Sequence, residues 1–165
     1  MPRAWIQRFP SHEPSSKTVS NARLVYVDSS ALVKLYVTEE GSTEAHALIN
    51  EAAATATSRV SQVEVASAVA RRVREKSLGQ DHASAILRAL ERDLDGTIIV
   101  AEVSPLLAAR AAGLTAAHAL RGMDAIHLAS AQWLQDKMGE PICLAAWDAR
   151  LTAAGRAAGL EVAGA

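Results

Sequence analysis

The chain has few cysteine and aromatic side chains. Of its 165 residues, one is Cys, one is Phe, two are Tyr and three are Trp. A single cysteine excludes a disulfide framework within the chain, and its apolar setting, ICLAAW, favours a buried structural thiol at Cys143 over a nucleophile. Half of the residues are hydrophobic, chiefly Ala, Leu and Val, so a helix-rich core of small and aliphatic side chains is expected.

An excess of charge of one sign is also lacking. The 17 basic and 18 acidic residues leave a net charge of −1, so a polyanion would have to be held by a local patch or a metal ion. No run of 18 apolar residues is present, and the first twenty residues lack the apolar core of a secretory signal. We therefore expect a cytoplasmic protein with no membrane association.

Several common catalytic motifs are missing. There is no G-x-G-x-x-G or P-loop sequence to cradle a nucleotide, and no G-x-S-x-G elbow to support a Ser–His–Asp triad. A phosphatase of the haloacid dehalogenase type would need D-x-D after the first strand, but Ser30 stands at the second position. No Cys/His spacing typical of a metal site is present either. The carboxylates remain the main candidates for chemistry.

Strand and helix signals alternate along one domain, residues 22–165, which follows a Pro- and Ser-containing arm, residues 1–21, that we expect to be flexible. Strands are expected at residues 24–27, 54–57, 97–103, 142–146 and 160–163. Helices are expected at residues 29–38, 42–53, 61–77, 81–95, 105–120, 124–138 and 149–158. This alternation predicts an α/β fold with a parallel sheet covered by helices on both faces.

Four acidic residues lie just after a predicted strand or at the opening of a helix. They are Asp28 after LVYV, Glu64 in SRVSQVEVASAV, Asp124 in RGMDAIHLASA and Asp148 in CLAAWDARL. In a parallel α/β sheet, the carboxyl ends of the strands and the starts of the following helices share one edge. Residues far apart in the chain can therefore meet there in one site.

Each acid also has a purely structural interpretation. Asp28 and Asp148 could be helix N-caps, Ser61 with Glu64 fits the capping box S-x-x-E, and Asp124 could complement a helix dipole. Capping does not require the acids to cluster, since two carboxylates about 4 Å apart repel by roughly 4 kcal/mol at an effective dielectric near 20. A divalent cation would remove that repulsion, and Mg²⁺ or Mn²⁺ prefers oxygen ligands.

An ordered set of motifs makes the sequence similar to a known family. DSSALVKLY, the Glu64 helix ending in ARRVRE, RGMDAIHLASA and WDARL together resemble the PIN domain, most closely the VapC toxins of bacterial toxin–antitoxin pairs, over residues 24–162. The resemblance implies a three-layer α/β/α sandwich that cuts RNA with Mg²⁺ or Mn²⁺. It also implies a VapB-like antitoxin whose tail fills the crevice, and a homodimer. The implied metal-binding and catalytic residues are Asp28, Glu64, Asp124 and Asp148.

One position departs from the family pattern. Many relatives have Thr or Ser two residues before the last acid, whereas this chain has Ala146, which puts the role of Asp148 in question. Ser30 matches a small hydroxylic position beside the first acid. Arg59 and Arg121 lie near acids and are weaker candidates for contacts with the RNA backbone.

His127 lies one helical turn from Asp124, where it could support the site, although an ordinary core or surface histidine is the more common outcome. Taken together, these features predict a metal-dependent endoribonuclease that activates water at a cluster of carboxylates. The alternative is a catalytically impaired PIN-like module that binds RNA or a protein partner, in which the acids act as helix caps.

Overall fold

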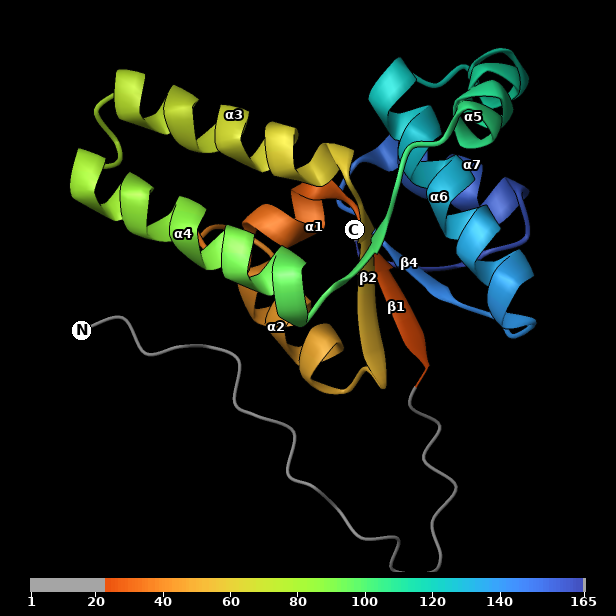
Figure 1. Ribbon diagram of the computed structural model, residues 1–165, viewed down its shortest axis with the longest axis horizontal. Coiled ribbons are helices and arrows are strands. Elements are labelled where there is room, and N and C mark those ends of the chain that lie inside the picture. Colours follow the sequence, from red (N-terminus) through yellow and green to blue (C-terminus); the bar gives the residue numbers. More distant parts are fainter. Residues whose placement is uncertain (1–22, 165) are drawn as a thin grey trace, which may run out of the picture.

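A computed structural model describes residues 23–164, so the predicted arm at residues 1–21 lies outside the described residues. A five-stranded sheet forms the centre of the molecule, with strand order β3-β2-β1-β4-β5 and every neighbouring pair parallel (Figure 1). The strands are β1 (Leu24–Val27), β2 (Ala54–Ser58), β3 (Ile99–Ala101), β4 (Cys143–Ala145) and β5 (Glu161–Ala163). Each predicted strand is present.

Helices cover both faces of the sheet, which confirms the predicted three-layer α/β/α architecture. One face carries α1 (Ser29–Val33), α2 (Ser42–Asn50), α3 (Val60–Arg74) and α4 (Gln80–Gly96), and the other carries α5 (Pro105–His118), α6 (Gly122–Met138) and α7 (Ala149–Ala157) (Figure 1). Within the described part of the chain, no helix is long and apolar enough to cross a membrane.

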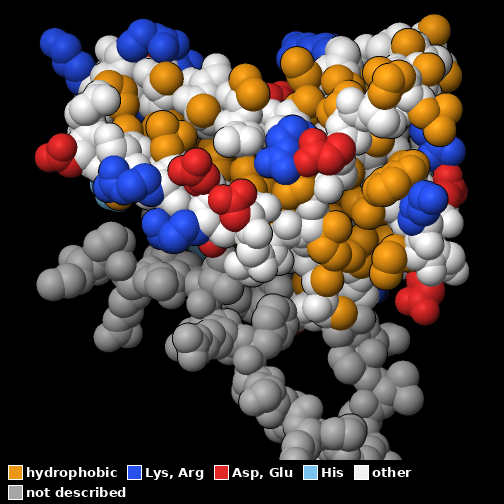
Figure 2. Space-filling model, in the orientation of Figure 1, with side chains coloured by type: hydrophobic (Ala, Val, Ile, Leu, Met, Phe, Trp, Pro, Cys, Tyr) orange, Lys and Arg blue, Asp and Glu red, His pale blue; other side chains and the backbone are white. Residues whose placement is uncertain are grey.

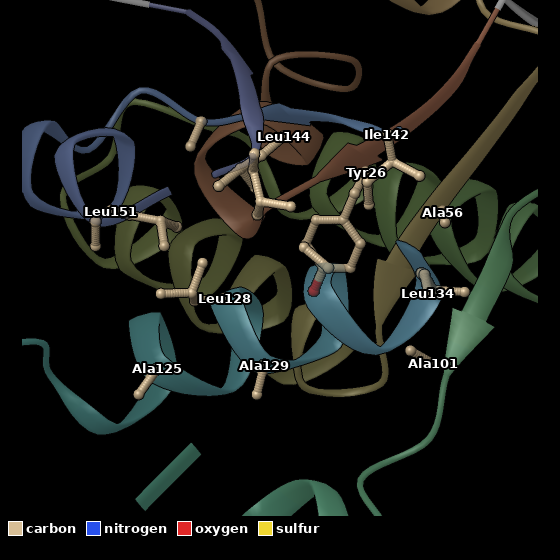
Figure 3. Packing of buried hydrophobic residues seen from close by; sticks show 14 of the residues in the cluster. Tyr26, Ala56, Ala101, Ala125, Leu128, Ala129, Leu134, Ile142, Leu144 and Leu151 are labelled. Carbon is tan, nitrogen blue, oxygen red and sulfur yellow. The ribbon is translucent and has the colours of Figure 1, made fainter. Parts of the chain in front are cut away.

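The central strand β1 divides the core into two clusters. Leu24 and Tyr26 pack with residues of α5, α6 and α7, whereas Val25 and Val27 pack with residues of α1, α3 and α4. Successive side chains of a strand point to opposite faces, so a strand buried on both sides reads as a continuous apolar run. Figure 3 shows Tyr26 projecting from β1 towards α6, in the cluster that also contains Leu134.

The strand order creates a topological switch point beside β1. The chain runs outward from β1 to β2 and β3, then crosses back so that β4 pairs with the other edge of β1. In open α/β sheets, ligands bind in the crevice outside the carboxyl ends of the strands at such a point. Asp28 directly follows β1, and its N–H donates to Ala145 O at the end of β4, 3.1 Å away.

Several elements are shorter than predicted, and two of them by four residues or more. The helix expected at residues 29–38 ends as a regular α-helix at Val33, because the next N–H groups, those of Lys34 and Leu35, bond three residues back rather than four. The strand expected at residues 97–103 contains only Ile99–Ala101, at the edge of the sheet. The buried helix α1 is thus a short connector that brings the chain from β1 towards α2.

The loop before α2 is fitted closely against the segment that follows β4. Gly41 has a φ of 82°, and a Cβ there would lie 2.5 Å from Trp147 Nε1. Gly139 also has a positive φ, 69°, but a Cβ there would meet no atom within 4 Å. The two glycines therefore share a left-handed backbone and differ in the space around them.

We predict that Gly139→Ala lowers the free energy of unfolding by about 1–2 kcal/mol, the cost of a left-handed conformation for a residue with a Cβ. Gly41→Ala should lower it further, since the indole of Trp147 must also move. Urea denaturation of both variants measures the difference. Equal losses would contradict the close packing of Trp147 against Gly41.

Candidate active site

Asp28 is held at the switch point by hydrogen bonds from two directions. It is only 4% exposed and caps α1 by accepting the Ala31 N–H at 2.8 Å. The Ser30 hydroxyl lies 2.8 Å from both carboxylate oxygens of Asp28 and accepts the Trp147 N–H at 2.9 Å. Ser30 therefore links the first acid to the segment after β4.

Burial raises the pKa of Asp28 above its ordinary value. The nearby His127 and the bonds from Ala31 and Ser30 act in the opposite direction, and the charge of Glu64 adds to the rise. The charge of Glu64, which is carried by α3, is thus felt at the buried carboxyl group of Asp28. The site concentrates negative charge in a place poorly solvated by water.

Glu64 lies in the second turn of α3 and is fixed by two donors. The Ser29 hydroxyl donates to Oε2 at 2.5 Å, and His127 Nε2 lies 2.9 Å from the same oxygen. Burial acts to raise the pKa of Glu64, but the hydrogen bonds from His127 and Ser29 outweigh it and hold the pKa below its usual range. Glu64 is therefore the acid of this group whose ionised form is best stabilised.

Asp124 is the least satisfied of these acids. It is the third residue of α6, and its Oδ2 is buried without a hydrogen-bond partner among the described residues. Burial raises the pKa of Asp124, and the charges of Asp148 and Glu64 raise it further, while His127 and Arg121 oppose the rise. A buried carboxylate oxygen normally has a partner, so this atom is a candidate ligand for a cation.

Asp148 caps α7, as one of its interpretations predicted. The N–H groups of Arg150 and Leu151 both donate to Oδ1, at 2.9 and 3.0 Å. The cap and a role in the acidic site are compatible, because the cap uses one carboxylate oxygen and the charge of Asp148 is still felt at Asp124.

The four acids thus lie towards one edge of the sheet, where the charge of Glu64 acts on Asp28 and the charges of Glu64 and Asp148 act on Asp124. Figure 2 shows the surface hollowed at this edge, between the side of α3 and the side of α5 and α6, with acidic atoms at the base of the hollow. Within residues 23–164, no three His, Cys, Asp or Glu side chains form a group that could hold a metal ion as they stand. The orphaned Asp124 Oδ2 and the all-oxygen donor set fit Mg²⁺ or Mn²⁺ in chemistry and charge.

Ser61, Arg59 and Arg121 lie beside the acids. The capping box of Ser61 and Glu64 is wrong, because α3 begins at Val60 and the Ser61 hydroxyl lies 2.7 Å from Thr57 Oγ1 instead. Arg59 is engaged by Glu102, with Nη2 2.6 Å from Oε1. Arg121 is the residue before α6, and its charge is felt at Asp124.

Sequence reasoning missed Ser29 and Tyr26 and undervalued His127. Tyr26 Oη lies 2.8 Å from His127 Nδ1, and His127 is 2% exposed. The sequence favours an ordinary core or surface histidine, but the contact of His127 with Glu64 joins residues 63 positions apart in the chain. The only local signal was the shared spacing of one helical turn that places His127 beside Asp124.

The arrangement of sheet, switch point and acids defines a known class of protein. Residues 25–138 match the PIN domain family, and the chain belongs to that family. Asp28, Glu64 and Asp124 fall inside the matched span, and Asp148 follows it.

Within this family the chain falls with the VapC proteins. It is 40% identical over 141 residues to ribonuclease VapC45 and, to the same extent, to ribonuclease VapC49, both of Mycobacterium tuberculosis. Each alignment covers 85% of this chain and 94% of the relative.

Solved structures share the fold at lower identity. VapC20 of Mycobacterium tuberculosis, a sarcin–ricin loop cleaving toxin, aligns with a TM-score of 0.61 and 23% identity, covering 79% of this chain and 95% of VapC20. FitAcB of Neisseria gonorrhoeae aligns with a TM-score of 0.58 and 16% identity, covering 84% of this chain and 95% of that structure. Both support the three-layer architecture.

Asp124 can be interpreted as a partner of the helix dipole or as a member of a charge cluster. The two interpretations predict opposite changes in the free energy of unfolding when its charge is removed. Asp81 also lies in the first turn of a helix, α4, and provides the matched control. In metal-free protein at neutral pH, Asp124→Asn should raise the free energy of unfolding, by about 1 kcal/mol or less because water reaches part of the carboxyl group. Asp81→Asn should lower it by a few tenths of a kcal/mol, roughly the value of a helix-dipole interaction.

The effect of Asp124→Asn should depend on pH in a defined direction. Since the folded-state pKa of Asp124 is raised, stability is lost as the pH rises through that pKa. Below the ordinary aspartate pKa of about 3.9, the carboxyl group is protonated in both states, and wild type and variant should converge. Urea denaturation across this range measures the difference, and a destabilised Asp124→Asn at neutral pH would refute the cluster.

Proposed function

We propose that this chain is a metal-dependent endoribonuclease and the toxin of a VapBC-type toxin–antitoxin pair. The observation that carries the proposal is the uncompensated negative charge at the switch point, above all the buried Asp124 Oδ2 without a partner. The 40% identity to two VapC ribonucleases over most of the chain supports RNA as the substrate. Hydrolysis of a phosphodiester bond is the chemistry that this site would perform.

The metal-binding residues in this proposal are Asp28, Glu64, Asp124 and Asp148. A bound Mg²⁺ or Mn²⁺ would lower the pKa of a water molecule and offset the charge that develops on the scissile phosphate. Asp28 and Glu64 are held in fixed positions by the hydrogen bonds described above, whereas Asp124 keeps one oxygen unbonded. No carboxylate needs to act as a nucleophile.

The chain lacks a hydroxyl at Ala146, which is fully buried. Ser30 supplies a hydroxyl at the same junction, because it accepts the N–H of Trp147 and approaches both oxygens of Asp28. In this proposal Ser30 orients Asp28 and keeps the segment carrying Asp148 in place. Although Ala146 has no hydroxyl, Ser30, which follows β1, would therefore support the acidic cluster in its place.

The partners of the proposed toxin follow from the same family. We infer a VapB-like antitoxin that covers the acidic hollow, a homodimer and a cytoplasmic location. Arg121 lies next to the acids and is the better placed of the two predicted arginines to contact RNA at the rim, because Arg59 is already paired with Glu102. Light scattering of the purified chain measures the oligomeric state.

The nuclease proposal predicts a metal requirement and a specific mutational pattern. Protein freed of antitoxin should cleave mixed RNA with Mn²⁺, and excess EDTA should abolish cleavage. Asp28→Asn and Asp124→Asn should each lower the cleavage rate by about 100-fold or more, since loss of a ligand should exceed the 10–100-fold effect typical of an outer partner. Cleavage is followed by gel electrophoresis of a labelled RNA.

Asp81→Asn provides the control, because it removes an aspartate from the first turn of another helix, α4. Its rate should equal that of wild type. Wild-type protein that leaves RNA intact in Mn²⁺ would favour the impaired binding module instead. Cleavage that persists unchanged in Asp28→Asn would assign the activity to a contaminant or to another site.

A further inference from the structure

A chain of hydrogen bonds runs from the core to the acidic site through His127. Tyr26 Oη lies 2.8 Å from His127 Nδ1, and His127 Nε2 lies 2.9 Å from Glu64 Oε2. Tyr26 is completely buried and His127 is 2% exposed, while Glu64 opens towards the hollow. These hydrogen bonds therefore connect a fully desolvated phenol to a partly accessible carboxylate.

The positions of the protons set which atom donates in each of these hydrogen bonds. A tyrosine phenol carries its proton at neutral pH, since its ordinary pKa is about 10, and Tyr26 Oη is close enough to donate that proton to His127 Nδ1. With Nδ1 accepting, the neutral imidazole carries its proton on Nε2 and donates it to Glu64 Oε2. Tyr26 thereby selects the tautomer that the ionised Glu64 requires.

The hydroxyls on the Glu64 side of His127 agree with this assignment. Thr57 Oγ1 donates to Val27 O at 2.7 Å, so Ser61, 2.7 Å away, is the donor to Thr57. The proton of Ser61 is thus committed, and the short 2.5 Å contact shows that Ser29 donates to Glu64 Oε2. Both donors to Glu64 then converge on one oxygen, and no described residue bonds to Oε1.

The same hydrogen bonds also link the elements that carry the acids. Tyr26 belongs to β1, which ends just before Asp28; Glu64 belongs to α3; and His127 lies one turn after Asp124 on α6. The buried imidazole therefore fixes the spacing of three elements at the edge of the sheet. Surface side chains could not impose this order, because their conformational freedom is larger.

We propose that His127 is a positioning residue that clamps Glu64 in the orientation required for metal binding, with Tyr26 setting the tautomer of His127. Ser29 and His127 both contact Oε2, so Oε1 would be the oxygen of Glu64 left to hold a cation. The inference rests on the proposed function, since it assigns a purpose to the orientation of Glu64. His127 itself contacts neither RNA nor metal in this account.

The clamp can be tested first in metal-free protein. Nitrogen NMR of the histidine rings, recorded well above the ordinary histidine pKa of about 6.5, reports which ring nitrogen carries the proton. Wild type should show His127 in the Nε2–H form. Tyr26→Phe removes only the phenolic hydroxyl and should shift His127 towards a mixture of tautomers, whereas Tyr36→Phe should leave His127 unchanged, because the Tyr36 hydroxyl donates to Asp93 instead.

Direct metal binding then tests the consequence for Glu64. Isothermal titration of Mn²⁺ into RNA-free protein should give a dissociation constant about 10-fold or more weaker for His127→Leu than for wild type, the usual effect of losing an outer partner of a metal ligand. His127→Gln can present an amide N–H near the position of Nε2 and should recover most of the affinity. Leu134→Ala, in the same helix and core cluster, loses stability through lost packing and should bind Mn²⁺ as wild type does.

The outcomes separate the clamp from a purely structural role and from the proposed function. If His127→Leu binds Mn²⁺ as tightly as wild type, or if His127→Gln is as weak as His127→Leu, the clamp is refuted. An Nδ1–H tautomer in wild type would also overturn it. Wild-type protein that binds no Mn²⁺ would contradict the proposed function. In that case the tautomer measurement still tests whether the hydrogen bonds from Tyr26 through His127 to Glu64 form as proposed.

Discussion

The repulsion among carboxylates gathered at one edge of a parallel sheet is the constraint on which the site depends. Asp28, Glu64, Asp124 and Asp148 reach this edge from four different elements, and their charges raise the pKa values of Asp28 and Asp124. Two such charges about 4 Å apart repel by roughly 4 kcal/mol at an effective dielectric near 20. A bound cation would offset this repulsion, which is why we propose a metal ion at this edge.

The protein supports this arrangement mainly with hydroxyl and backbone N–H donors, together with the imidazole of His127. Ser30 and the Ala31 N–H hold Asp28, Ser29 and His127 hold Glu64, and the first turn of α7 holds Asp148. These groups fix each carboxylate without cancelling its charge, so the capacity to bind a cation is kept. Asp124 Oδ2 receives no such support from the described residues, so the pKa of Asp124 should respond most strongly to an added cation.

Much of the fold could be predicted from the sequence, because its signals are local. The apolar run at Leu24–Val27, Pro105 at the start of α5 and the alternation of strands with helices predict the architecture. The early end of α1 depends on a tightening of its last turn, which no residue type specifies. The strand order depends on which edge of β1 receives β4, a choice made by packing over more than a hundred residues.

The positions of the acids could also be predicted, because each one follows a strand or opens a helix. Their supporting partners could not, since the contacts of His127 with Tyr26 and Glu64 span 101 and 63 positions in the chain. The capping box of Ser61 and Glu64 shows the same limit: the local motif is present, but Ser61 contacts Thr57 in the preceding strand and Glu64 contacts Ser29, 35 positions away.

The most direct test of the central claim is a carbon NMR titration of the Asp124 carboxyl group with and without Mg²⁺. The account predicts a pKa above the ordinary aspartate value of about 3.9 in metal-free protein and a pKa below it once Mg²⁺ saturates the site. An Asp124 pKa that is ordinary in the metal-free protein and unmoved by Mg²⁺ would contradict the account.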